Sequence, residues 1–312
     1  MSTADGTRAV VAALSANLGI AVTKFVAFAL TGSSAMLAES IHSVADSGNQ
    51  VLLLVGGRRS RRGATPDHPF GYGRERYLYA FVVSVVLFVV GGLFALYEAY
   101  HKLIHPEAID SWHWVPLVVL GTAIGLESLS FRTAIRETNK IRGGMTWGGF
   151  IRRAKVPELP VILLEDFAAL VGLVLALLGV GLTLLTGNGI WDALGTGAIG
   201  ILLVVVAIVL AIETKSLLIG EAPVEEQTAA IERAIIEGPE VERVIHLRAV
   251  HIGPEDVLVA VKVAVRHDDT AAAVARGIDA VEARIRAALP IARVIYIEPD
   301  ILQAGTKDHE TA

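Results

Sequence analysis

The chain has 312 residues, of which 53% are hydrophobic and 19% are charged, with a formal net charge of −5. This composition is too apolar for a typical soluble domain and indicates an integral membrane protein. The sequence contains no cysteine, which excludes disulfides, thiolate metal ligands and thiol redox chemistry.

Six apolar segments, each near the roughly 20 residues that a helix needs to cross a bilayer, precede residue 214. They cover approximately residues 9–31, 34–57, 77–103, 114–136, 159–186 and 190–213. The connectors after the second and fourth segments, "RRSRRGATPDHPFGYGRER" and "RETNKIRGGMTWGGFIRRAK", are strongly basic, whereas the connectors after the first and fifth are uncharged. Because basic loops stay on the cytoplasmic side, we predict an even number of spans with both termini in the cytoplasm. The first segment lacks the features of a cleavable signal and is predicted to be a span.

The composition beyond about residue 215 is that of an ordinary soluble domain. Its periodicity predicts, in order, a helix, two strands, a second helix and a final strand. We therefore predict a membrane all-α six-helix transmembrane domain at residues 1–214 and a small α+β (α-β-β-α-β) cytoplasmic C-terminal domain at residues 215–303. The tail at residues 304–312 is predicted to be disordered.

The second apolar segment carries polar side chains on one side only. At 100° per residue, Glu39, His42, Asp46 and Asn49 fall within an arc of about 80°. Charged groups that face lipid are costly, so we expect this stripe to face the interior of the helix bundle. His42 and Asp46 are one turn apart and can supply half of a tetrahedral site for a divalent metal such as zinc. The alternative is a hydrogen-bond network that only holds helices together.

The fifth segment contains a second polar cluster, the adjacent carboxylates Glu165 and Asp166. Adjacent residues point about 100° apart, so we expect no more than one of them to share a site fully with the second segment. Two neighbouring carboxylates in an apolar run favour binding of a divalent cation or of protons. Glu127 in the fourth segment is a further candidate, either beside the ligands or as a structural partner. Glu98, near the outer end of the third segment, is interpreted as interfacial, and the connector that follows it, "HKLIHPEAIDSWHW", is rich in histidine.

The chain resembles the cation diffusion facilitators, a family of six-span divalent metal/proton antiporters. The resemblance rests on "GSSAMLAESIHSVADSGNQVLLL", "HPFGYGRERYLYAF", the six-span order and the C-terminal "VIYIEP". It implies a homodimer in which the second and fifth spans of each protomer build an intramembrane metal site. His42, Asp46 and Asp166 match the family's ligands, and Glu39 and Asn49 are expected beside them or in the proton pathway.

The fifth span departs from the family pattern. Ile162 stands where a ligand one turn before Asp166 is common, and Glu165 is expected to replace it. The Glu-Asp pair resembles the divergent branch that includes a mammalian zinc-transporter homologue. Accessory metal sites of the family also lack some of their ligands in this sequence. In the basic loop Asp67 and His68 remain as a candidate site, but Tyr72 stands where a second histidine can occur.

The C-terminal domain also lacks ligands found elsewhere in the family. Tyr296 and Glu298 replace metal-binding residues there. We expect His246, His251 and His267 to lie on the surface rather than to bind metal, and the domain to dimerise mainly by packing.

We therefore predict a secondary transporter of the cell (plasma or inner) membrane that exports a divalent cation in exchange for protons. Zn²⁺ is the leading candidate for this cation. No phosphate-binding loop that could power transport by nucleotide hydrolysis is present in the sequence. We expect no enzyme activity, no permanently bound cofactor and no nucleic-acid partner, and we expect contact with membrane lipid and with a second copy of the chain. The alternatives are an Mn²⁺ or Fe²⁺ transporter of the same fold, or a metal-responsive membrane scaffold without transport, which the isoleucine at position 162 would explain.

Overall fold

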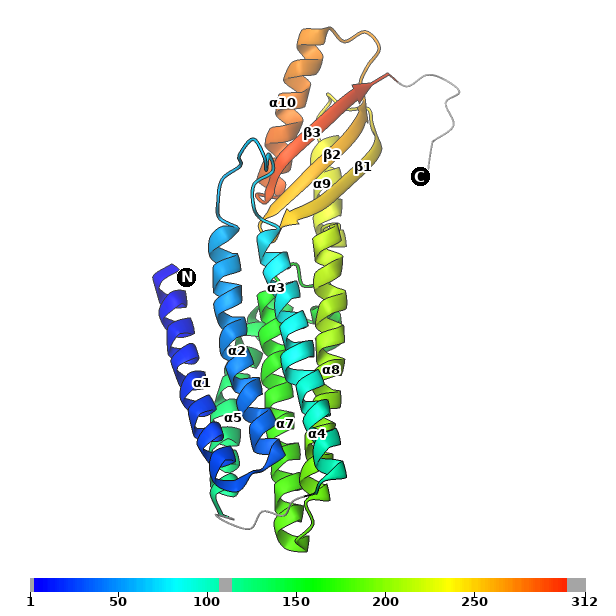
Figure 1. The fold of residues 1–312 in the computed structure, drawn as a ribbon. Helices are drawn as coiled ribbons and strands as arrows, with labels where there is room; N and C mark the ends of the chain where they lie inside the picture. The colour runs from blue at the N-terminus through cyan, green and yellow to red at the C-terminus, as the bar shows by residue number, and fades with distance from the viewer. Residues whose placement is uncertain (1–2, 107–113, 302–312) are drawn as a thin grey trace. The chain divides into compact units, whose positions relative to one another are not determined.

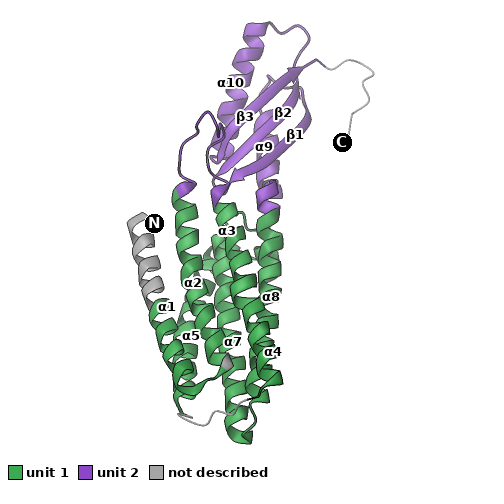
Figure 2. Ribbon diagram, in the orientation of Figure 1, with its two compact units in different colours: residues 1–58, 76–215 green, residues 59–75, 216–312 purple. Residues whose placement is uncertain are grey.

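The structure is a computed structural model that describes residues 3–106 and 114–301, with side chains described from Asn17 onward except that of Ser34. Its contacts divide the chain into two compact units (Figure 2), one of residues 1–58 and 76–215 and the other of residues 59–75 and 216–312. The second unit thus contains the loop between the second and third helices. The tail predicted to be disordered, residues 304–312, lies outside the described residues.

The first unit is a bundle of helices (Figure 1). Its elements are α1 (Thr3–Thr31), α2 (Ser34–Arg59), α3 (Glu75–Val86), the π-helix η1 (Leu87–Leu93), α4 (Phe94–Ile104), α5 (Trp114–Arg142), α6 (Trp147–Arg153), α7 (Glu158–Thr186) and α8 (Ile190–Ile219). The last turn of α8, from Ser216, belongs to the second unit. The elements α3, η1 and α4 follow one another without a break and form one long helix.

Four helices in the described part of the chain are long and apolar enough to cross a membrane: Glu75–Ile104, Trp114–Arg142, Glu158–Thr186 and Ile190–Ile219. The apolar part of α1, Asn17–Thr31, is shorter. Helix α2 has the length but not the hydropathy, because the polar stripe that includes Glu39 and Asp46 interrupts its apolar residues. The predicted count of six spans is therefore confirmed only in part, whereas an apolar helical domain followed by an α+β domain is confirmed.

Small residues allow the helices to pack closely around an aliphatic core. A methyl group at Gly179 of α7 would lie 2.9 Å from the backbone oxygen of Trp191, and one at Gly195 of α8 would lie 3.1 Å from that of Leu175. Only glycine fits such an approach of two helix backbones, a recurrent device in membrane bundles. At the turn between α1 and α2, Gly32 adopts a left-handed φ of 67°, which lets the chain reverse direction in two residues.

The second unit contains α9 (Glu225–Ile236), β1 (Arg243–Gly253), β2 (Asp256–Ala264), α10 (Ala271–Ala288) and β3 (Ala292–Asp300), in the predicted order (Figure 1). The sheet order is β1-β2-β3, with β1 antiparallel and β3 parallel to β2. Alternate residues of β2, from Val257 to Val263, are buried against apolar side chains of α9 and α10, including Ile231 and Ile285. The two helices therefore cover one face of the sheet.

Candidate metal site

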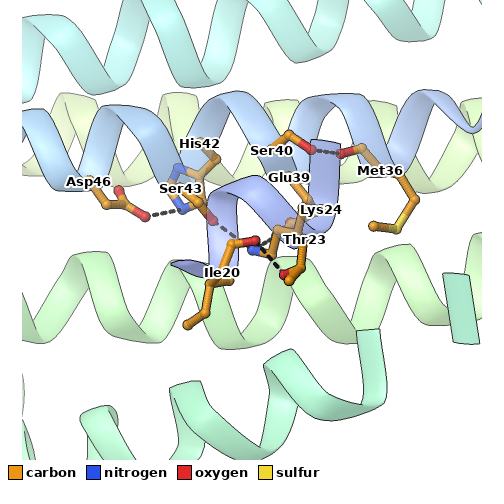
Figure 3. Close-up of polar contacts among 9 residues, drawn as sticks. All are labelled: Ile20, Thr23, Lys24, Met36, Glu39, Ser40, His42, Ser43 and Asp46. Carbon is orange, nitrogen blue, oxygen red and sulfur yellow. Dashed lines mark hydrogen bonds and ion pairs between the residues drawn. The ribbon is translucent and has the colours of Figure 1, made fainter. Parts of the chain in front are cut away.

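The polar stripe of α2 faces inward. Glu39, His42 and Asn49 are buried, whereas Val44 and Val51 on the other side of the helix are exposed. His42 Nε2 lies 3.5 Å from Asp46 Oδ2, one turn further along the helix (Figure 3). The side chain of Asp46 is 13% exposed and that of His42 is 1% exposed. An imidazole nitrogen and a carboxylate oxygen therefore converge at a point almost closed to the outside.

Several polar atoms along this stripe have no hydrogen-bond partner among the described residues. They are Glu39 Oε1, His42 Nδ1 and Nε2, Asp46 Oδ1 and Asn49 Oδ1. Buried polar groups are nearly always satisfied, and an exception calls for an explanation such as an ion that binds there. The concentration of unpaired acceptors on one helix face fits a site for a cation or for protons better than a network that only holds helices together.

The two carboxylates of α7 diverge. Glu165 Oε1 accepts a hydrogen bond of 2.6 Å from Asn49 Nδ2 of α2, whereas Asp166 Oδ2 accepts one of 2.9 Å from Ser130 Oγ of α5. Glu165 is buried and Asp166 is partly exposed. Glu165 is thus linked to the stripe of α2 through Asn49, and Asp166 lies on the side of α7 that meets α5. Ile162, one turn earlier, packs against the apolar core.

Lys24 of α1 is a buried charged residue next to the stripe that the sequence analysis did not predict as part of the site. Its Nζ lies 3.1 Å from Glu39 Oε2 and 2.8 Å from Ser43 Oγ, and it is fully buried (Figure 3). Its position in the sequence could have indicated this, because Lys24 is the one charged residue in the apolar run from residue 9 to residue 31. A charge within such a run needs a partner of opposite charge. The ion pair offsets the negative charge of Glu39 next to the stripe.

Two glycines bring neighbouring helices against the same stripe. A methyl group at Gly172 of α7 would lie 2.8 Å from Glu39 Oε1, and one at Gly91 of η1 would lie 3.8 Å from His42 Nδ1. The π-helix η1 therefore passes beside the imidazole. A π-helix inside an α-helix is rare and is frequent at functional sites, and the sequence pattern gave no sign of it.

The remaining candidates lie on elements other than α2 and α7. Glu127 of α5 is 7% exposed. In the loop of the second unit, Asp67 and His68 are both exposed, and the His68 ring stacks on Tyr72 with ring centres 4.5 Å apart. Among the described residues, no three His, Asp or Glu side chains lie close enough together to hold a metal ion. In this structure the most compact candidate in the bundle is thus the pair His42–Asp46.

The histidines of the second unit require one correction. His246 and His267 are exposed, but the prediction that His251 lies on the surface is wrong, because its side chain is 1% exposed and its Nδ1 lies 3.2 Å from the backbone oxygen of Gly253. The register of β1 against β2 shifts between His251 and Gly253, and such a bulge changes the direction of a side chain. Glu298 and Asp300 each lie 3.0 Å from the Nζ of Lys262, so a lysine occupies the centre of that carboxylate pair.

Comparison with known proteins agrees with this arrangement of helices. The model of the cation efflux transmembrane domain matches residues 10–219. The chain is 32% identical over 232 residues to the proton-coupled zinc antiporter SLC30A9, mitochondrial, of Homo sapiens, an alignment that covers 74% of this chain and 41% of that protein. It is 30% identical over 249 residues to metal tolerance protein C4 of Arabidopsis thaliana, covering 79% of this chain and 54% of that protein.

The chain also aligns in part with solved structures. A structure of the MamM-CTD aligns with 26% of this chain and 95% of its own chain, at 25% identity and a TM-score of 0.24. The present chain thus spans less than half the length of the human zinc antiporter that it matches. Because the family model covers most of the bundle, including α2 and α7, the chain belongs to the cation efflux family, the cation diffusion facilitators.

Proposed function

We propose that this protein is a secondary transporter that exports a divalent cation from the cytoplasm in exchange for protons, and that Zn²⁺ is its preferred ion. The observation that carries the proposal is the set of unpaired buried acceptors around His42 and Asp46, in a chain of the cation efflux family. The similarity to a protein named as a proton-coupled zinc antiporter supports the choice of ion and of coupling.

The proposed ligands come from two helices. His42 and Asp46 supply a nitrogen and an oxygen from α2. Glu165 and Asp166 of α7, which point apart in this structure, are proposed to turn their oxygens toward the same ion, which gives a donor set that suits Zn²⁺. The hydrogen bond from Asn49 to Glu165 keeps the Glu165 carboxylate next to the stripe. When the cation leaves, protons replace it on the same acceptors, because the unpaired carboxylates and imidazole cannot remain buried without a positive partner. Glu39 and Glu127 are proposed to assist as neighbouring acceptors.

Transport into proteoliposomes tests this function. We expect Zn²⁺ uptake, followed with an encapsulated zinc indicator, to rise with an outward proton gradient and to fall to the protein-free level in Asp46→Ala. Ser47→Ala is the matched control, because Ser47 is buried on the same helix and its hydroxyl donates to the backbone oxygen of Ser43. Uptake that ignores the gradient, or that survives in Asp46→Ala, contradicts the proposal.

The identity of the ion is tested by competition in the same vesicles. With one imidazole and several carboxylates the site also suits Mn²⁺ or Fe²⁺, which accept oxygen-rich coordination. We expect Zn²⁺ to outcompete both at equal concentration, since Zn²⁺ binds a given nitrogen and oxygen set more tightly. Faster uptake of Mn²⁺ or Fe²⁺ would change the ion but keep the mechanism.

We further propose that the protein works as a homodimer in the cell membrane, with both termini in the cytoplasm. The face of the sheet that α9 and α10 leave uncovered carries Tyr296 at 57% exposure, which suits contact with a second copy. Light scattering of the purified protein in detergent gives its mass, and cysteines added at the loop between α2 and α3, in a chain that has none, report its sidedness by labelling.

A further inference from the structure

Two histidines lie one above the other where α4 ends. His101 is in the last turn and His105 is the C-cap residue, and the backbone N–H of His105 donates to the oxygen of His101. Both side chains are exposed. The two rings have centres 5.5 Å apart and planes inclined by 33°. Neither histidine takes part in the intramembrane site described above, so their pairing needs a reason of its own.

The 5.5 Å between the two ring centres is close to the distance expected when two imidazoles bind the same metal ion. Two imidazoles that bind one tetrahedral Zn²⁺ through nitrogens at about 2.0–2.1 Å have ring centres about 5 Å apart. A spacing of four residues on a helix keeps two side chains on one face. The separation of the ring centres therefore allows one nitrogen from each imidazole to bind a shared ion.

The neighbours of the pair favour a cation. Glu98, half-buried, precedes His101 by three residues and lies on the same side of α4. Its carboxylate adds negative charge near this end of the helix, which favours a cation. The carbonyl end of a helix also attracts positive charge. Lys102 is the one cation next to the pair in sequence, and its side chain is buried rather than exposed with the imidazoles.

The pair stands on the helix that passes the proposed transport site. Gly91 of η1 lies against His42, and His101 follows it by ten residues, or about 15 Å of helix. The continuous helix Glu75–Ile104 thus has Gly91, which lies beside His42, in its middle. His101 is in its last turn, and His105 is its C-cap residue.

We propose that His101 and His105 form a second binding site for a late first-row divalent cation, at the end of α4. Two imidazoles leave coordination positions for water, so the site binds and releases its ion readily rather than holding it as a structural zinc. Binding at this pair does not depend on the proposed transport activity and is measured without it.

The test uses the full-length protein in lipid nanodiscs with Cu²⁺ alone as the probe, since Cu²⁺ binds most tightly of the divalent first-row ions. All variants carry Asp46→Ala to disable the intramembrane site. We expect an electron spin echo signal of two imidazoles on one Cu²⁺, which added Zn²⁺ displaces. His101→Asn and His105→Asn should each reduce the signal to one imidazole and weaken binding about 10²-fold, because the second imidazole binds as part of the same molecule.

The control is His267→Asn, which removes an exposed histidine of the second unit and should leave signal and affinity unchanged. Both variants of the pair change exposed side chains at a helix end, so circular dichroism should show unchanged helix content. A two-imidazole signal that survives both substitutions, or that is missing from the parent protein, overturns the proposal. Reduction to a one-imidazole signal in each single variant, with His267→Asn unchanged, supports it.

Discussion

The buried pair of Lys24 and Glu39 shows how single side chains prepare the candidate site. The ammonium of Lys24 bonds Glu39 and Ser43, while Glu39 Oε1 lies against the backbone of α7 at Gly172. A carboxylate that already has a cation as its partner competes poorly for a second one. Glu39 is therefore better suited to setting the charge around His42 than to binding the transported ion itself.

We expect Lys24→Met to destabilise the protein by about 3–5 kcal/mol, because it leaves a buried carboxylate without its partner. The double variant Lys24→Met with Glu39→Gln should recover most of that loss, since it removes both charges together. Denaturant unfolding in mixed micelles, followed by tryptophan fluorescence, measures the cycle. A double variant that is no more stable than Lys24→Met would contradict the explanation that the loss comes from an unpaired carboxylate.

At the scale of elements, the helix pair that covers the sheet is fastened by an ion pair. Arg284 of α10 bonds Glu240, just beyond α9, with Nη2 3.0 Å from Oε2, and donates from Nε to the backbone oxygen of Ala234 in α9. A hydrogen bond from its own backbone and then the guanidinium of Arg284 lower the pKa of Glu240 below its ordinary value. The side chain is 29% exposed, so solvent screens the pair.

The direction of that pKa shift predicts a pH dependence. Because the folded state lowers the pKa of Glu240, its contribution to stability is present above the unfolded pKa of about 4.3 and is lost as pH falls through the folded pKa. Glu240→Gln should cost about 0.2–1 kcal/mol at pH 7 and nothing near pH 3. Thermal unfolding at both pH values checks this, with Glu232→Gln, an exposed carboxylate of α9, as control. An equal loss at both pH values contradicts the explanation.

At the scale of the whole molecule, the chain passes between the two units three times, because the loop at residues 59–75 belongs with the C-terminal unit. A methyl group at Gly73 in this loop would lie 2.8 Å from the backbone oxygen of Ile252 and 3.0 Å from the Cα of Gly253, at the end of β1. The contact is between backbones and cannot be relieved by moving a side chain. The loop that joins α2 to α3 is thus docked on the β1–β2 hairpin.

We expect Gly73→Ala to loosen this docking at a cost of about 1–3 kcal/mol, the usual range for overpacking. Hydrogen exchange should become faster in the loop and in the hairpin at Ile252 and Gly253. Gly63→Ala is the control, because a methyl group at Gly63 meets nothing within 4 Å. Unchanged exchange in Gly73→Ala would mean that the loop does not depend on this contact.

The sequence predicted what depends on periodicity and missed what depends on how elements meet. The inward stripe from Glu39 to Asn49 follows from 100° per residue, and the helix and strand order of the second unit follows from its hydrophobic pattern. The partner of Lys24 depends on the close return of α2 after Gly32, which no periodicity contains. The burial of His251 depends on a shift of strand register, and π-helix η1 is an extra residue in a turn that apolar residues do not mark.

The Lys24–Glu39 pair also bears on how the protein enters the membrane during synthesis. Either charge alone in the bilayer centre costs about 2.5–3.5 kcal/mol on insertion scales. Joined by a two-residue turn, α1 and α2 present a neutral pair instead. The first two helices are therefore better inserted together, as a helical hairpin, than one after the other. A nascent chain that is arrested before Glu39 has emerged from the ribosome should leave α1 outside the bilayer.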